Sequence, residues 1–159
     1  VVWAAMRRLR EEGEEIGGLI SVATLTGAAM MAGGYRTLAI TKNKELRRYI
    51  EDLGIANGER VQPEGLVIED TKATGHASTH KADAKNMDMT RLRGAQNACA
   101  YIKDNGGIEE VPHLHFDIAP ALHPHQNGTP KDVRGEFSAE GFLDTLYTCL
   151  AETPEKLAA

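Results

Sequence analysis

The side chains best suited to chemistry gather in one short stretch of the sequence. His113, His115 and Asp117 alternate along HLHFDI, and His123 and His125 follow soon after. Because successive residues of a strand point to opposite faces, an extended conformation places the first three on one face. Two histidines on one face could reach a single metal ion. No HExxH or similar ligand template accompanies them, so we favour a partly buried polar face over a metal site.

A second candidate site is the sequence ATLTG at Ala23–Gly27. An apolar strand runs there into a glycine turn, whose exposed carbonyls and amides could bind a peptide-like ligand through its backbone. Ligands of α/β proteins gather at the carboxyl ends of strands. The segment Asp117–Leu122, which ends the histidine-containing strand, therefore also qualifies as part of a binding site.

A run of alternating charges, HKADAKNMD, contains Lys81, Asp83, Lys85 and Asp88. Such a run is most simply explained as the solvated edge of a loop. Asp83 lies between two alanines, and it is the member that we expect to point inward and orient neighbouring groups.

The periodicity of apolar residues predicts strands separated by helices. The expected strands are Leu19–Thr24, Tyr35–Thr41 and His113–Ile118, and the expected helices are Val1–Glu15, Ala28–Ala32, Lys44–Ile55, Arg93–Lys103 and Ser138–Glu152. Trp3, Met6 and Leu9 form the expected apolar face of the first helix. The stretches Arg60–Lys85 and Pro120–Gly135 show no clear period, so we expect them to be irregular.

This order of elements predicts an α/β fold with a mixed, largely parallel sheet flanked by helices. Three strands make a small sheet with exposed edges. The first helix has no capping residue before it and starts at Val1 rather than at a methionine. We therefore expect the chain to be an incomplete portion of a larger domain.

The composition is that of a folded soluble domain, with 42% hydrophobic and 26% charged residues. A formal net charge of -5 gives no reason to expect binding to nucleic acid or to an anionic membrane. The charge-free run Ile16–Tyr35 is long enough to span a bilayer, but its glycines favour a strand, a turn and a short helix. Cys99 and Cys149 form no CxxC pair, so we expect buried free thiols and a reducing, cytoplasmic location.

Several motifs resemble one family in the same order along the chain. The segment ISVATLTGA at Ile20–Ala28 resembles the leucyl aminopeptidases, also called the cytosol aminopeptidase family. The other matches are KADAKN (Lys81–Asn86) to S-D-x-A-D-x-K-N, RLRGAQNACAYI (Arg91–Ile102) to a glycine- and alanine-rich helix, HFDIAPAL (His115–Leu122) to H-x-D-I-A-G, and SAEGFLDTL (Ser138–Leu146) to A-T-G-F-G-V-x-L-L. Together they cover about Ile20 to Glu152.

The resemblance implies a peptidase that uses two divalent ions, Zn or Mn, to activate a bridging water. The family signature N-T-D-A-E-G-R, which carries two of the metal-binding carboxylates, lies upstream of the first helix and is absent here. By this match, residues 1–152 form the C-terminal portion of the catalytic domain without its metal ligands. Residues 153–159 follow the last expected helix, and we expect them to form a flexible tail. This portion alone would bind no metal and have no activity. The family also assembles as homo-hexamers, so the same assembly is expected.

The resemblance further assigns substrate-binding roles to individual positions. Thr24, Leu25 and Gly27 would hold the backbone of a peptide substrate. Ala119 and Leu122 would line the pocket for its first side chain. From their positions in the sequence, we expect Asp83 and Asp117 to support the site. Pro120 stands where the family has glycine.

Three interpretations follow from these observations. The first is an aminopeptidase represented by its C-terminal portion. The second is a structural relative that keeps the fold and the assembly but has lost catalysis, which the change from glycine to Pro120 mildly favours. The third is an independent small protein with a histidine-based metal site. The metal ligands upstream of Val1 would distinguish the first two.

Overall fold

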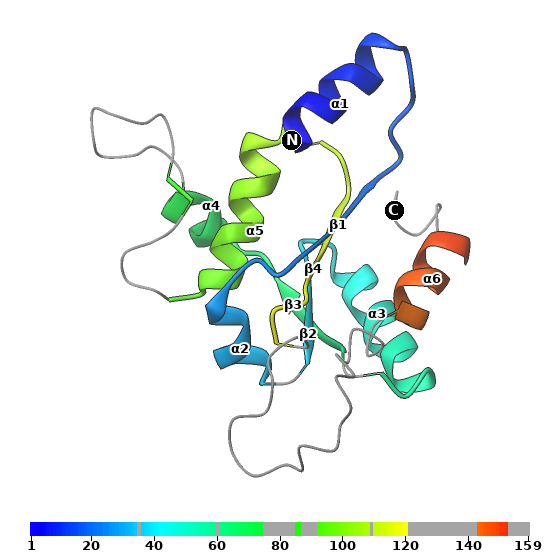
Figure 1. Ribbon diagram of the computed structural model, residues 1–159, viewed down its shortest axis with the longest axis vertical. Helices are drawn as coiled ribbons and strands as arrows, with labels where there is room; N and C mark the ends of the chain where they lie inside the picture. Colours follow the sequence, from blue (N-terminus) through cyan, green and yellow to red (C-terminus); the bar gives the residue numbers. More distant parts are fainter. Residues whose placement is uncertain are drawn as a thin grey trace.

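A computed structural model describes residues 1–34, 36–59, 61–74, 85–86, 92–108, 110–120 and 143–152 of the chain. The elements follow one another as α1 (Val2–Glu11), β1 (Leu19–Ala23), α2 (Gly27–Gly33), β2 (Thr37–Thr41), α3 (Lys44–Ala56), β3 (Val61–Gly65), α4 (Ile68–Thr74), α5 (Gly94–Asn105), β4 (His113–Asp117) and α6 (Leu143–Glu152) (Figure 1). The tail 153–159 and the first part of the expected last helix lie outside the described residues.

The four strands form one sheet in the order β1-β4-β2-β3. β1 runs parallel to β4, and β2 runs parallel to β3, whereas β2 and β4 are antiparallel. The predicted α/β class with a mixed, largely parallel sheet is therefore confirmed. The carboxyl ends of β1 and β4 meet at one edge of the sheet, with the start of β2 beside them.

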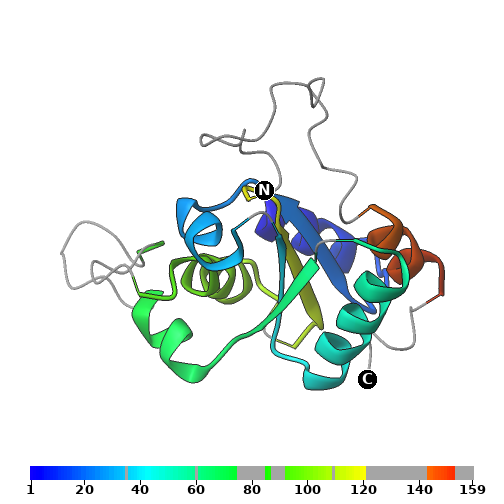
Figure 2. The ribbon, with the colours of Figure 1, turned by 90° about the horizontal axis from the view of Figure 1, so that it is seen from below.

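Helices cover both faces of this sheet, as the view in Figure 2 shows. On one face, Leu38 and Ile40 of β2 pack against α2 and α5 through Ala29, Ala95 and Cys99. The opposite face packs against α3 and α6, in a core whose buried members are Ala39, Leu46, Ile50, Leu114, Phe116 and Cys149. The alternation of strand side chains between faces divides the apolar residues between these two layers.

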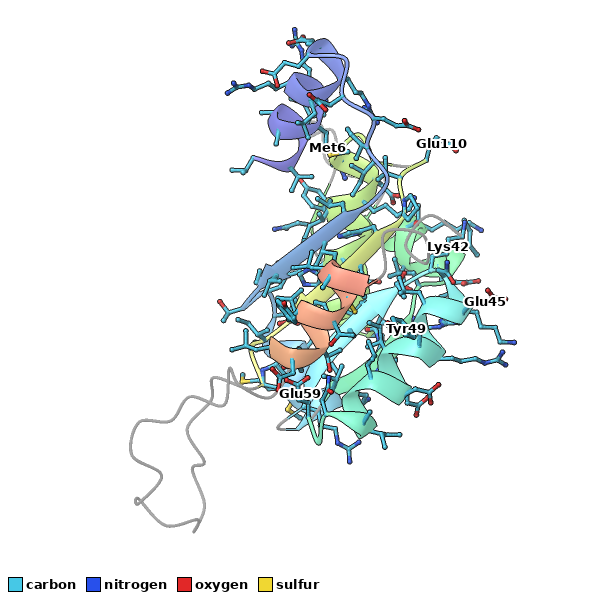
Figure 3. The ribbon with its side chains drawn as sticks, turned by 90° about the vertical axis from the view of Figure 1, so that its right-hand side faces the viewer. Met6, Lys42, Glu45, Tyr49, Glu59 and Glu110 are labelled. Atoms are coloured by element: carbon cyan, nitrogen blue, oxygen red, sulfur yellow. The ribbon has the colours of Figure 1, made fainter. Side chains whose placement is uncertain are left out.

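The helix α6 is attached to the other elements by a side chain from a distant part of the chain. Glu59, in the loop after α3, accepts hydrogen bonds from the amides of Asp144 and Thr145 at 2.7 and 2.8 Å (Figure 3). These amides belong to the first turn of α6, where amides lack partners within the helix. The carboxylate thus caps α6 and favours its position beside α3.

One sequence-based expectation about the sheet is wrong. Of the two stretches expected to be irregular, Arg60–Lys85 contains β3 and α4, so the sheet has four strands rather than three among the described residues. β3 reads VQPEG, and its proline and polar residues hide a strand from pattern analysis. Proline is tolerated there because β3 lies at the edge of the sheet.

The first helix also differs from its expected form. Met6 is buried, but Trp3 and Leu9 are 53% and 36% exposed. The packed face instead uses Val2 and Met6, one helical turn apart, against the apolar cluster that contains Ile108. The guanidinium carbon Cζ of Arg7 lies 5.5 Å from the centroid of the Trp3 ring.

The charge-free run that begins at Ile16 is divided between β1 and α2. Among the described residues, none of the helices has both the length and the apolar character that crossing a bilayer requires.

Candidate functional site

The turn after β1 and the segment after β4 leave the sheet side by side. Ala23 and Asp117 are partners in the parallel register of the two strands. Beyond the last pair, the amide of Ile118 donates a hydrogen bond to the carbonyl of Ala23 at 2.9 Å. The two segments that the sequence suggested as binding elements are therefore adjacent.

One carboxylate connects these two segments. Oδ1 of Asp117 accepts hydrogen bonds from the amides of Leu25 and Ala119 at 3.0 and 3.2 Å. Its Oδ2 accepts a hydrogen bond from the Thr26 hydroxyl at 2.9 Å. The Asp117 side chain is fully buried. Asp117 therefore holds the backbone on both sides of the strand pair.

Thr26 extends this network into α2. Its hydroxyl accepts a hydrogen bond from the amide of Ala29 at 3.0 Å, while it donates to Asp117. Thr26 is the N-cap of α2, a position that favours threonine. Sequence reasoning placed Thr26 within the ATLTG segment but gave it no role of its own, although a threonine before a short apolar helix is itself a capping signal.

Burial raises the pKa of Asp117, and the hydrogen bonds from Ala119, Thr26 and Leu25 oppose part of this effect. Both carboxylate oxygens already accept hydrogen bonds from these donors. The geometry therefore describes a group that positions the backbone rather than one that exchanges protons with a ligand.

The described residues leave the space around Gly27 open. Among their atoms, a Cβ at this position would meet only Cε of Met30 within 4 Å, at 3.9 Å. Gly27 also lacks the positive φ that would itself require glycine. A ligand backbone could therefore approach Gly27 without displacing a side chain.

The two strand histidines form a second polar cluster, around Ser21 of β1. Nε2 of His113 and Nδ1 of His115 each lie 2.8 Å from the Ser21 hydroxyl oxygen. A hydroxyl has one proton, so Ser21 donates to one ring and accepts from the other. Within the described part of the chain, the outer nitrogens, Nδ1 of His113 and Nε2 of His115, are buried and have no partner.

Burial lowers the pKa of both histidines to about 4, with contributions from Lys103 at His113 and from His113 at His115. Both rings are therefore neutral at pH 7. They are also more deeply buried than the partly buried face expected from the sequence, at 5% and 0% exposed. Across the described ranges, no group of three or more His, Cys, Asp or Glu side chains is arranged to hold a metal ion.

Some of the candidate site residues lie within the described part of the chain, and others lie outside it. Leu25 and Ala119 are half-buried beside the Asp117 carboxylate, and Thr24 is exposed at the end of β1. Leu122 and Asp83 lie outside the described residues. Every described member of the predicted site belongs to the turn after β1 or to the end of β4.

The family model described as the cytosol aminopeptidase family, catalytic domain, matches residues 5–143. The probable cytosol aminopeptidase of Persephonella marina is 33% identical over 106 residues, which are 66% of this chain and 20% of that protein. The probable cytosol aminopeptidase of Cenarchaeum symbiosum is 30% identical over 125 residues, 78% of this chain and 24% of that protein. The chain thus spans less than a quarter of the length of these relatives.

Solved structures agree with these matches. A variant of tomato leucine aminopeptidase aligns with a TM-score of 0.61 and 26% identity, covering 78% of this chain and 23% of that one. Leucine aminopeptidase of Caenorhabditis elegans aligns with a TM-score of 0.58 and 26% identity, covering 77% and 25% of the two chains.

Proposed function

Since this chain belongs to the cytosol aminopeptidase family, we propose that it is the substrate-binding portion of a metal-dependent aminopeptidase. The proposed reaction hydrolyses the first peptide bond of a peptide and releases its N-terminal residue. The observation that supports this proposal best is the shared carboxylate of Asp117. It holds the turn after β1 and the end of β4 together at one edge of the sheet.

In this proposal, the turn after β1 binds the substrate backbone. Thr24 and Leu25 offer carbonyl groups, while the Leu25 amide stays bound to Asp117. Gly27 leaves room among the described residues for the peptide to approach. Ala119 and Leu122 line the pocket for the first side chain. The role of Leu122 rests on the family resemblance, and the supporting role of Asp83 rests on its position between two alanines in the sequence. Asp117 positions both segments and does not contact the substrate.

Two divalent ions, Zn or Mn, would supply the activated water in such an enzyme. The described residues do not fit this pair of ions. The carboxylate of Asp117 is occupied by three hydrogen bonds, and the inner nitrogens of His113 and His115 face Ser21. We propose that the metal ligands come from other parts of the catalytic domain, so that the chain alone is inactive.

A second candidate is a non-catalytic subunit with the same fold. Pro120, which replaces the family glycine, is buried and lies near Gly33 at the end of α2. Such packing is suited to a structural role of this segment. In either case we propose that the protein is cytoplasmic and that it assembles as a homo-hexamer. Analytical ultracentrifugation of the purified protein can test the assembly.

The deciding experiment compares the chain alone with the longest natural protein that contains it. Both are assayed on leucine p-nitroanilide with added Zn or Mn. We expect hydrolysis only by the longer protein, and loss of that activity with a chelator. Hydrolysis by the chain alone would show that its own residues hold the metals. A longer protein that is folded but inactive with either metal would favour the non-catalytic subunit.

A further inference from the structure

The start of α5 has an unusual backbone conformation. Arg93, the N-cap of α5, has φ 50° and ψ 40°. It is the only residue other than glycine with a positive φ in the described part of the chain. A side chain destabilises this left-handed conformation, so surrounding contacts must hold it in place.

A buried carboxylate provides those contacts. Nε and Nη2 of Arg93 donate to the two oxygens of Asp70 at 2.7 and 2.9 Å. Nη2 also donates to the carbonyl of Gly65, at the end of β3, at 2.8 Å. The Asp70 side chain is 1% exposed and also accepts a hydrogen bond from the amide of Val67. The paired geometry fixes the direction of the guanidinium as well as its position.

The next residue brings α5 directly against α2. A Cβ atom at Gly94 would lie 2.7 Å from the Cβ of Ala28, so only glycine permits this spacing. Ala95 and Ala29 are both buried in the same cluster. Figure 2 shows α2 and α5 together on one side of the sheet. The first turn of α5 therefore packs against the first turn of α2.

The first turn of α2 is also part of the candidate site. The amide of Ala29 donates to Thr26, and Thr26 donates to Asp117, which holds Leu25. A continuous series of contacts thus leads from Asp70 and Arg93 to the turn after β1.

We propose that Arg93 is a positioning residue, which fixes the position of the turn Thr24–Gly27 through the packing of α5 against α2. This inference rests on the proposed function only in assigning substrate binding to that turn. Asp70 and Gly65 hold Arg93, Arg93 places Gly94, and Gly94 places the first turn of α2. A substrate contact is not part of this role.

Hydrogen exchange of single amides, measured by NMR on the 159-residue chain, tests the inference without requiring enzymatic activity. Arg93→Gly permits the left-handed backbone but removes the guanidinium. We expect the amides of Leu25 and Ala29 to exchange about tenfold faster in this variant, while amides of α3 and α6 keep their protection. Arg93→Lys keeps the charge without the paired geometry and should restore part of the protection.

Two further variants separate positioning from general stability. Gly94→Ala leaves the ion pair intact but pushes against Ala28, and it should accelerate exchange at the same two amides. Arg8→Ala removes an exposed ion pair to Glu12 on α1 and should change neither amide. Unchanged protection of Leu25 and Ala29 in both Arg93→Gly and Gly94→Ala would overturn the inference. So would a uniform loss of protection over all helices, which indicates global destabilisation only.

In the proposed longer enzyme, we expect the same variants to raise KM several-fold more than they lower kcat, because in this proposal the turn binds the substrate backbone. If that protein proves inactive, the proposed function fails while the exchange result still decides whether Arg93 positions the turn.

Discussion

Leu25 and Ala119, which belong to distant parts of the chain, donate their amides to the same oxygen of Asp117, at 3.0 and 3.2 Å. The arrangement brings the turn after β1 and the end of β4 to one place on the sheet. Because the shared acceptor is a buried carboxylate, removing it leaves donors from both segments without a partner. The relative position of the two segments therefore depends on this side chain as well as on the pairing of β1 with β4 and on the hydrogen bond from Ile118 to Ala23.

Replacing this side chain should destabilise the fold locally. In Asp117→Asn, one acceptor oxygen becomes an NH2 group. This group either faces the amides of Leu25 and Ala119 or forces the Thr26 hydroxyl to accept instead of donating. We expect a loss of about 1–3 kcal/mol in the free energy of unfolding, measured by urea denaturation. The control Asp52→Asn, at an exposed position of α3, should change it little. Equal stability of the two variants would contradict the positioning role of Asp117.

The buried histidines predict a loss of stability in acid. Their pKa is lowered to about 4 in the folded protein, below the ordinary value of 6.5. The unfolded chain therefore binds more protons between these values, and the folded state loses stability as the pH falls through that range. A single ring with this shift lowers the free energy of unfolding by about 3 kcal/mol once the pH is below both pKa values. The raised pKa of Asp117 acts in the opposite direction.

Urea denaturation at a series of pH values, together with NMR titration of the imidazole protons, measures this effect. We expect His113 and His115 to titrate near pH 4 while the chain remains folded. Titration of either ring near 6.5 in the folded chain would show that it is exposed to solvent.

The cap on α6 should control access to a buried thiol. In Glu59→Gln, α6 loses a negative charge at its N-terminus and one acceptor, at a cost of about 1 kcal/mol. Cys149 of α6 and Cys99 of α5 are both fully buried, so each reports on its own helix. We expect Ellman's reagent to label Cys149 faster in this variant, with labelling of Cys99 unchanged. Glu51→Gln, at an exposed position of α3, is the control; equal acceleration at both cysteines would indicate global opening instead.

A bulky side chain at Gly27 should obstruct a ligand rather than the fold. A Cβ atom at this position meets no described atom closer than Cε of Met30, at 3.9 Å, so we expect Gly27→Leu to fold. In the proposed longer enzyme, we expect kcat/KM to fall about tenfold or more, with the midpoint of thermal unfolding nearly unchanged. Gly17→Leu, which also meets open space, is the matched control. Wild-type kcat/KM in Gly27→Leu would remove the turn from the proposed binding site.

Local patterns in the sequence were sufficient for the α/β class and for both candidate segments. The apolar run before ATLTG and the alternation in HLHFDI are properties of neighbouring residues, so they can be recognised without knowledge of the fold. The same reasoning failed at β3, whose proline and polar residues are tolerated only because it lies at the sheet edge.

Contacts between distant residues required the tertiary structure. The order β1-β4-β2-β3 brings Asp117 to Leu25, and the packing of α4 and α5 brings Asp70 to Arg93. No periodicity encodes these pairs, because their partners are far apart in the sequence and depend on strand order and helix packing. The sequence alone thus determined the class of fold and the two segments of the candidate site, while the tertiary structure decided which side chains hold those segments together.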